Sequence, residues 1–199
     1  MIRRIALALL LMLPAAALVV LFAWKLIDKD AVSSGFAVND ISVEVHEDNV
    51  TVRPFKLALL DGQEIQLSDY EGKIVMVDFW SSWCPPCIKE AAVLQAVYAK
   101  YQDRGVEFLG IAIWDDKQQV VDHLQEYGVT YPNGLDVDGA ITVDYGIAGI
   151  PEKVFIGPSG EALRKFVGPF DEGTLEQVLD EFLAQYPVET LETTVSSGS

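Results

Sequence analysis

The chain is poor in residues that bind metals or cofactors. Its 199 residues include two cysteines and two histidines. His46 and His123 stand alone, with no spacing that links them to the cysteines, and residues 136–139 lack most of a calcium loop, so we expect no metal site. There is no glycine-rich phosphate loop, and Ile88 follows Cys87 where a haem-attachment motif needs histidine. We therefore expect no cofactor.

Positive charge is also scarce. Lysine and arginine number 14 against 30 acidic residues, a formal net charge of −16. This balance argues against nucleic acid and anionic membrane surfaces as partners. We interpret the acidic excess as a solubility feature, with an acidic face for a basic partner as the alternative.

One long apolar run lies at the N-terminus. Residues 5–24 are uncharged, and twenty helical residues span about 30 Å, the thickness of a bilayer's hydrocarbon core. Arg3 and Arg4 precede the run, which predicts a cytoplasmic N-terminus and a translocated remainder. A cleaved signal peptide, cut near residues 15–17, is the alternative.

These features predict four segments and a location. Residues 1–27 are a cytoplasmic stub and transmembrane signal anchor, 28–51 a stalk, 52–186 the folded domain and 187–199 a disordered tail. The protein would be a single-pass cell-membrane protein, with its domain on the extracytoplasmic side.

The only two cysteines, Cys84 and Cys87, lie three residues apart. A disulfide between them closes a very short loop, which restricts the unfolded chain little. An exported chain would normally use cysteines as structural links, but this spacing suits that purpose poorly. The pair is better interpreted as a working redox dithiol.

Strand and helix patterns alternate along the domain. Residues 74–80 form a nearly continuous apolar run, typical of a strand buried on both faces. Pro85 then suits the first position of a helix. The other expected elements are a hairpin over 55–67, strands over 41–45, 106–114, 154–156 and 162–167, and helices over 85–104, 117–127, 140–145 and from 171–174 to 186. This order predicts one three-layer α/β domain.

Two motifs resemble a known family. Val-Asp-Phe-Trp-Ser-Ser-Trp-Cys-Pro-Pro-Cys at 77–87 resembles the active-site segment of the thioredoxin superfamily. Ile-Ala-Gly-Ile-Pro-Glu at 147–152 resembles its loop ending in a cis-proline. Over about 52–186 the chain resembles membrane-anchored thiol–disulfide oxidoreductases of the TlpA/ResA/DsbE type. This resemblance implies a thioredoxin-like three-layer fold with a mixed central sheet and an N-terminal β-hairpin. A peroxiredoxin is disfavoured, because Val77 and Ser81 replace the proline and threonine of its Pro-x-x-x-Thr-x-x-Cys pattern.

The cysteines should have different roles. We predict Cys84 as the exposed attacking nucleophile, because the N-terminal end of a helix favours the thiolate that attacks disulfides. Cys87, one turn further on, should be the buried resolving thiol. Pro85 and Pro86 lack N–H groups, which limits stabilisation of the thiolate. The couple should therefore be a reductant rather than a strong oxidant.

Two acidic residues are candidate proton carriers. Asp78 is a lone carboxylate in a buried strand, where it should be neutral or paired. The resemblance implies that it accepts the proton of Cys87, and a solvated residue on an edge strand is the alternative. Glu90 should lie one turn beyond Cys87, where the resemblance implies tuning of the cysteines or substrate binding, and an ordinary solvated glutamate is the alternative. Which acid carries the proton stays open.

Substrate-binding candidates flank the cysteines. A cis bond at Pro151 would place the backbone of Ile150 beside the dithiol, ready to pair with an extended substrate. Glu152 follows in the family pattern. Trp83 is predicted as a surface for the substrate chain, and Trp80 as a core residue.

The combined prediction is an extracytoplasmic disulfide reductase that acts on disulfides of exported proteins. A membrane electron donor must reduce it again, because the sequence offers no site for a reduced nicotinamide or a flavin. The resemblance makes cytochrome c maturation the leading pathway, with apocytochrome c as substrate. The alternatives are a general extracytoplasmic reductase and a non-catalytic, membrane-anchored peptide-binding module.

Overall fold

The computed structural model describes residues 37–39, 43–45, 52–186 and 188. Contacts divide the chain into residues 1–37 and 38–199, and the second unit holds all described residues except Ala37. The predicted anchor and most of the predicted tail lie outside the described residues. Among the helices that are described, none combines the length and apolarity needed to cross a membrane.

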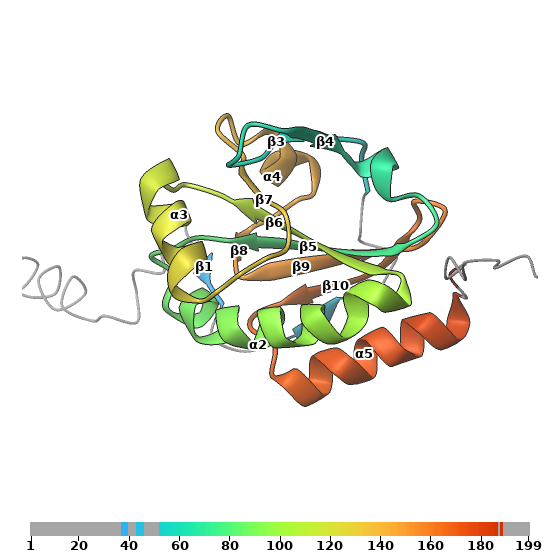
Figure 1. Cartoon of the computed structure of the whole chain (residues 1–199). Coiled ribbons are helices and arrows are strands. Elements are labelled where there is room, and N and C mark those ends of the chain that lie inside the picture. Colours follow the sequence, from blue (N-terminus) through green and yellow to red (C-terminus); the bar gives the residue numbers. More distant parts are fainter. Residues whose placement is uncertain (1–36, 40–42, 46–51, 187, 189–199) are drawn as a thin grey trace, which may run out of the picture. The chain divides into compact units, whose positions relative to one another are not determined.

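A six-stranded mixed sheet forms the centre of the domain (Figure 1). Its central strand β5 (Ile74–Trp80) is buried along its whole length, as its continuous apolar sequence predicts. β5 runs parallel to β6 and antiparallel to β9. The strands follow the order β2 (Val43–Val45), β10 (Ala162–Val167), β9 (Glu152–Ile156), β5, β6 (Val106–Ala112) and β7 (Asn133–Leu135).

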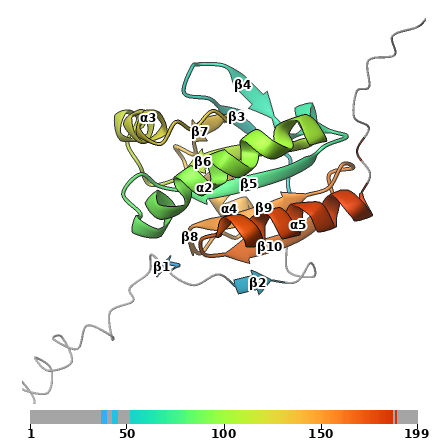
Figure 2. The same ribbon diagram turned by 60° about the horizontal axis from the view of Figure 1, so that its bottom comes forward.

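Helices and a hairpin cover the two faces of the sheet. Figures 1 and 2 show α2 (Pro85–Tyr101) and α5 (Glu172–Gln185) together on one side, which we call the helix face. The hairpin of β3 (Lys56–Ala58) and β4 (Glu64–Gln66), with α4 (Ala140–Asp144), lies over the other side. The described residues also form η3 (Leu67–Tyr70), η4 (Gln102–Arg104) and α3 (Lys117–Glu126), with the short strands β1 (Ala37–Val38) and β8 (Gly149–Ile150). The predicted three-layer α/β fold is confirmed.

The two core clusters follow the alternation of side chains along β5. Ile74 and Met76 belong to the cluster beneath α2 and α5, whereas Val75 and Val77 belong to the cluster beneath the hairpin. Successive side chains of a strand point to opposite faces. Asp78 therefore points toward the helix face, where α2 carries the cysteines.

Two strands differ from the sequence-based expectations. β2 lies inside the predicted stalk, yet it pairs with β10 as an edge strand of the main sheet. β7 was not predicted, because its three residues Asn-Gly-Leu carry no strand pattern. Its pairing with β6 overrides local preference, and the Asn133 side chain accepts a hydrogen bond from Trp80 Nε1 at 3.0 Å.

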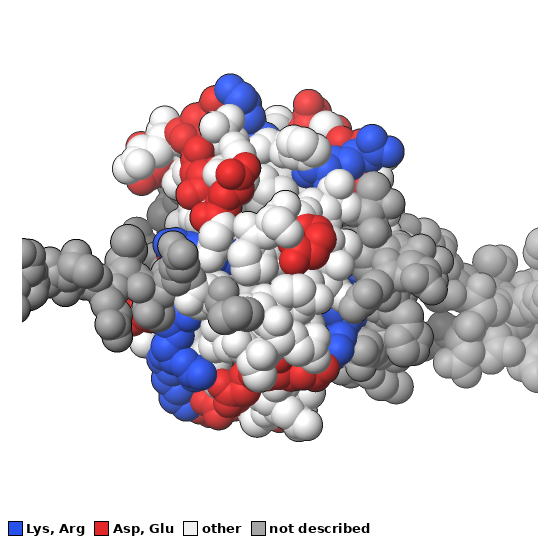
Figure 3. Space-filling view, turned by 90° about the vertical axis from the view of Figure 1, so that its right-hand side faces the viewer, with Lys and Arg blue, Asp and Glu red and all other residues white. Residues whose placement is uncertain are grey.

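Charged side chains of both signs mix on the surface. On the face shown in Figure 3, blue and red groups lie next to one another around a mostly uncharged central area that contains one red group. Ion pairs join α2 and η4 to α5, as at Lys100 with Glu172 and Arg104 with Asp180. The interpretation of the net charge as a solubility feature stays a prediction.

Candidate active site

The cysteines lie where β5 passes into α2. Cys84 is the N-cap of α2, with extended backbone angles, and Pro85 follows at the first helical position. The two cysteines form a disulfide with a Cα–Cα distance of 5.3 Å. The backbone N–H of Cys87 donates to Cys84 Sγ at 3.4 Å. One helix N–H thus reaches the sulfur even though Pro85 and Pro86 have none to give.

The expected exposure of Cys84 is wrong for this oxidised state. Cys84 has no exposed surface, and Cys87 is 3% exposed. The physical reason is that Cys84 belongs to a buried apolar cluster that also contains Ile150, while its sulfur is bonded to Cys87 and accepts the Cys87 N–H. In this oxidised state Cys84 is therefore shielded from solvent.

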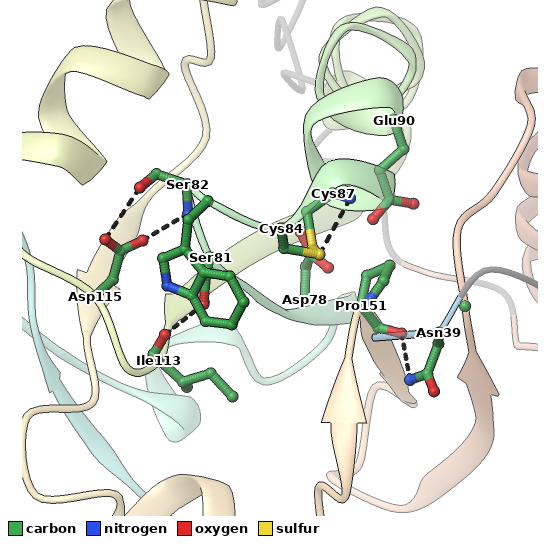
Figure 4. Close-up of a disulfide and its surroundings, with 12 residues drawn as sticks. Asn39, Asp78, Ser81, Ser82, Cys84, Cys87, Glu90, Ile113, Asp115 and Pro151 are labelled. Carbon is green, nitrogen blue, oxygen red and sulfur yellow. Dashed lines mark hydrogen bonds between the residues drawn. A yellow bond between two sulfur atoms is a disulfide. The ribbon is translucent and has the colours of Figure 1, made fainter. Parts of the chain in front are cut away.

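The loop before the cysteines is fixed to the end of β6 (Figure 4). The Asp115 carboxylate accepts hydrogen bonds from the Ser82 N–H at 2.6 Å and the Ser82 hydroxyl at 3.0 Å. Ser81 Oγ donates to the carbonyl of Ile113, and Trp83 Nε1 donates to that of Trp114 at 3.0 Å. Such contacts hold the loop, and with it the start of α2, in one position.

A buried cluster of charge lies beneath the disulfide. Asp78, Glu90 and Lys153 are each at most 2% exposed. Lys153 Nζ donates to Glu90 Oε1 and lies 3.5 Å from Asp78 Oδ1. Asp78 and Lys153 are register partners on β5 and β9, and Glu90 reaches them from α2. The alternatives of a solvated Asp78 and a solvated Glu90 are therefore excluded.

Burial favours the protonated forms of both acids. It raises the pKa of Asp78, against the lowering effect of Lys153. It likewise raises the pKa of Glu90 to about 7, an effect that Lys153 opposes and Asp78 reinforces. Burial, with these two carboxyls nearby, raises the pKa of the Tyr131 hydroxyl well above its usual value.

A small cavity connects Asp78 with Cys87. Its volume is about 10 Å³, the lower limit of what one water needs. Asp78, Cys87, His123 and Tyr131 line it together with apolar side chains of α2 and α3. Burial lowers the pKa of His123, so the imidazole is neutral at pH 7. Asp78 and Cys87 thus line the same small cavity.

The predicted cis-proline is present at the Ile150–Pro151 bond. The sequence predicts Glu152 as a substrate-binding residue, but the structure places its carboxylate in the interior. Glu152 Oε1 accepts the N–H groups of Ala148 and Gly149 at 3.3 and 3.0 Å. Its other oxygen lies 2.7 Å from Lys165 Nζ. In this arrangement Glu152 holds the loop that presents Ile150, while its role toward substrate stays a prediction.

The chain's own residue 39 occupies the edge beside the cis-proline. The N–H of Asn39 donates to the Ile150 carbonyl at 2.7 Å, and its side-chain amide donates to the Pro151 carbonyl at 3.3 Å. Figure 4 shows the second of these bonds. The edge is therefore able to bind an extended backbone segment.

The two tryptophans near the cysteines differ in environment. Trp80 is buried, as predicted. Trp83 is 43% exposed, as is Trp114 on the neighbouring loop. Trp114 also has φ at +52°, a backbone conformation that non-glycine residues rarely adopt.

Sequence reasoning missed Lys153 and Asp115. A lysine inside an apolar strand, two residues beyond the cis-proline, was a usable signal, because a buried ammonium needs an acidic partner. Asp115 gave no local signal, since only the fold brings it to Ser82. Across the described residues, no three His, Cys, Asp or Glu side chains gather in a way that could hold a metal ion.

The fold and this site define the chain as a thioredoxin-like thiol–disulfide oxidoreductase. It belongs to the AhpC/TSA family, whose model matches residues 49–164. Similar proteins are named thiol-disulfide oxidoreductase ResA. The one from Oceanobacillus iheyensis is 37% identical over 127 residues, covering 63% of this chain and 66% of that protein. The one from Bacillus thuringiensis subsp. konkukian is 33% identical over 129 residues, covering 65% and 72%.

Solved structures agree with this assignment. A secreted Mycobacterium tuberculosis disulfide oxidoreductase, described as homologous to E. coli DsbE, matches with a TM-score of 0.59 and 27% identity. The match covers 64% of this chain and 95% of that one. The predicted membership of the thioredoxin superfamily is thereby confirmed.

Proposed function

We propose that the protein is an extracytoplasmic disulfide reductase, anchored by residues 1–27, that acts on disulfides of exported polypeptides. The observation that carries the proposal is the Cys84–Cys87 disulfide at the N-terminus of α2, with a buried acid beneath it and a backbone edge beside it. The apolar run behind two arginines supports the location. A membrane electron donor would return the disulfide to the dithiol.

The reaction would proceed by two exchanges. The Cys84 thiolate attacks one sulfur of the substrate disulfide, and the other substrate sulfur leaves as a thiolate. Cys87 then attacks Cys84 Sγ and passes its proton to a buried carboxylate, for which Asp78 is the candidate. The second substrate sulfur leaves as a thiolate. Two electrons move from the dithiol to the substrate, and Cys84–Cys87 ends oxidised.

An extended segment would be held at Ile150 and Pro151 during these steps. The Ile150 carbonyl already pairs with an extended segment in this structure, which supports docking by backbone hydrogen bonds. Trp83, exposed beside the cysteines, would contact the substrate's side chains. Recognition by backbone atoms would allow many sequences near the target disulfide.

Within this activity we propose apocytochrome c as the substrate, on the resemblance to DsbE-type proteins. The test uses a peptide with an oxidised Cys-x-x-Cys-His segment and a control peptide with the histidine moved away from the cysteines. We expect the reduced protein to reduce the first with a kcat/KM at least ten times higher. Equal rates would favour a general reductase, and binding without thiol exchange would favour the peptide-binding module.

The direction of electron flow is tested by the reduction potential. The missing N–H groups of Pro85 and Pro86 leave the backbone N–H of Cys87 as the donor to Cys84 Sγ. A weakly stabilised thiolate gives a reducing couple, so we expect a potential far below the value of about −120 mV for a strong oxidant. A value near that figure would contradict the reductase assignment.

A further inference from the structure

The buried cluster contains more carboxylates than cations. Lys153 is the ammonium that contacts both Asp78 and Glu90, and all three side chains are almost fully buried. With both carboxylates ionised, the cluster would bury one uncompensated negative charge, which is strongly unfavourable in a protein interior. The favoured state of the oxidised protein therefore holds one proton on the two acids.

The hydrogen bonds show which acid holds that proton. Glu90 accepts from two donors, Lys153 Nζ at one oxygen and the Phe170 N–H, at 2.9 Å, at the other. Two such donors stabilise a carboxylate. Asp78 Oδ1 has only the 3.5 Å approach of Lys153 and, within the described part of the chain, no hydrogen-bond partner. Glu90 is thus the ionised member, and Asp78 holds the proton.

The neighbouring groups leave this assignment intact. Cys87 and Glu90 face the cluster from α2, and Lys153 faces it from β9. Tyr131 and His123 lie close to Asp78 around the cavity. The pKa of the Tyr131 hydroxyl is raised and that of His123 is lowered, so both side chains are neutral near pH 7. They add no second cation that could pair with Asp78.

We infer that Lys153 is a positioning residue: by pairing with Glu90, it leaves Asp78 as the carboxyl that exchanges a proton with Cys87. Asp78 lines the cavity with Cys87, whereas Glu90 is absent from its lining. Glu90 acts through Lys153: it takes the hydrogen bond of the ammonium, which approaches Asp78 Oδ1 only to 3.5 Å. This inference rests on the proposed dithiol chemistry and assigns the proton transfer, which the sequence left open between the two acids.

Opposite changes in pH dependence test the inference. In Glu90→Gln the competing carboxylate is gone and Lys153 pairs with Asp78 alone, so Asp78 should lose its proton at least about one pH unit lower. In Lys153→Met the cation is gone, and Asp78 should titrate at least about one pH unit higher. Below the midpoint, one unit corresponds to about a tenfold change in the fraction of ionised base.

Two readouts separate this role from a structural one. The first is the titration of the Asp78 carboxyl in the oxidised full chain, followed by carbon NMR, which requires no substrate. The second is the pH profile of thiol exchange with dithiothreitol. Glu90→Gln should lower the midpoint of both the carboxyl titration and the pH profile, and Lys153→Met should raise both. Shifts in the same direction, or none, would overturn the inference, as would an ionised Asp78 beside a protonated Glu90.

Control variants keep the test decisive. Lys165→Met removes the other buried lysine, which pairs with Glu152, and should lower stability without moving either midpoint. If Lys153→Met does not fold, Glu90→Gln alone still tests the inference. This variant should fold, because the Asp78 carboxylate and the Lys153 ammonium balance each other's charge. If the proposed function failed, thiol exchange would be absent in the wild type, yet the carboxyl titration would still report the role of Lys153.

A second inference comes from a different contact. We propose that residues 38–39 act as a strap that occupies the substrate edge and must leave before a polypeptide docks. Asn39 fills the hydrogen-bonding position of the Ile150 carbonyl and adds a side-chain bond to Pro151. A substrate strand at the same carbonyl would compete with it. The inference rests on the proposed docking of substrate at this edge.

Loss of the strap should speed reduction of polypeptides but not of small molecules. Asn39→Pro removes both donors, and we expect about a fivefold higher kcat/KM for a disulfide peptide, in line with the modest net stability of such bonds. Asn39→Ala removes the side-chain donor only and should give about twofold. Exchange with dithiothreitol should not change.

The outcomes distinguish the strap from the function. A peptide reduced equally by the wild type and Asn39→Pro would overturn the strap. A peptide reduced by neither protein would instead contradict the proposed function.

Discussion

Replacing Cys87 with serine is expected to stop turnover and to leave Cys84 covalently joined to its substrate. Cys84 can still attack a substrate disulfide, because it caps α2 and its sulfur accepts a helix N–H. Serine at position 87 cannot resolve the mixed disulfide that results. Turnover should fall by about a thousandfold or more, in line with the loss of an essential catalytic group.

The trapped species can be seen directly. After mixing the full-length Cys87→Ser protein with membranes or exported proteins, a non-reducing gel should show a new band that dithiothreitol removes. Mass spectrometry of the band would identify the partner and thereby the pathway. Cys84→Ser is the matched control and should trap nothing. A band of equal intensity with Cys84→Ser, or none with Cys87→Ser, would argue against the assigned roles.

Asp78→Asn should slow the resolving step by about a hundredfold at pH 7, the usual contribution of a general base. Burial raises the pKa of Asp78, so below this pKa the wild-type carboxyl is protonated and cannot accept a proton. The wild-type rate should therefore rise with pH through that pKa. The variant should lose this rise and follow only the Cys87 thiol, whose ordinary pKa is about 8.5.

Rapid-mixing kinetics of the mixed disulfide from pH 5 to 9 would measure this effect. Asp115→Asn is a suitable control, because this carboxylate holds Ser82 by two hydrogen bonds but does not line the Asp78 cavity. Its loss should lower the rate equally at every pH. An unchanged profile for Asp78→Asn would remove Asp78 from the mechanism.

Elements with strong local patterns were predicted well. The apolar run at β5 and the start of α2 at Pro85 agree with the structure within a residue. β7 was missed, since its pairing with β6 comes from the fold. A short strand was expected over residues 41–45, where β2 lies, but its place in the main sheet depends on β10, more than a hundred residues away.

The site shows the same division. Cys84, Cys87 and the cis-proline were identifiable because their chemistry requires particular residues at fixed spacing. The environments of Asp78 and Glu90 could not be identified, because the same sequence is compatible with a solvated and with a buried carboxylate. Lys153 shows that both carboxylates are buried and paired. It is the register partner of Asp78 on the neighbouring strand, and it forms an ion pair with Glu90 of helix α2.

By itself the sequence determined the dithiol, the three-layer fold and the expectation of a membrane anchor, because spacing and periodicity act locally along the chain. Only the tertiary structure decided which groups surround the dithiol. It placed one lysine between two acids, turned Glu152 inward against Lys165 and laid Asn39 on the edge beside Pro151. These arrangements depend on burial and on contacts between distant segments. Such contacts set the free energy of protonating a carboxyl group or of burying a charged side chain.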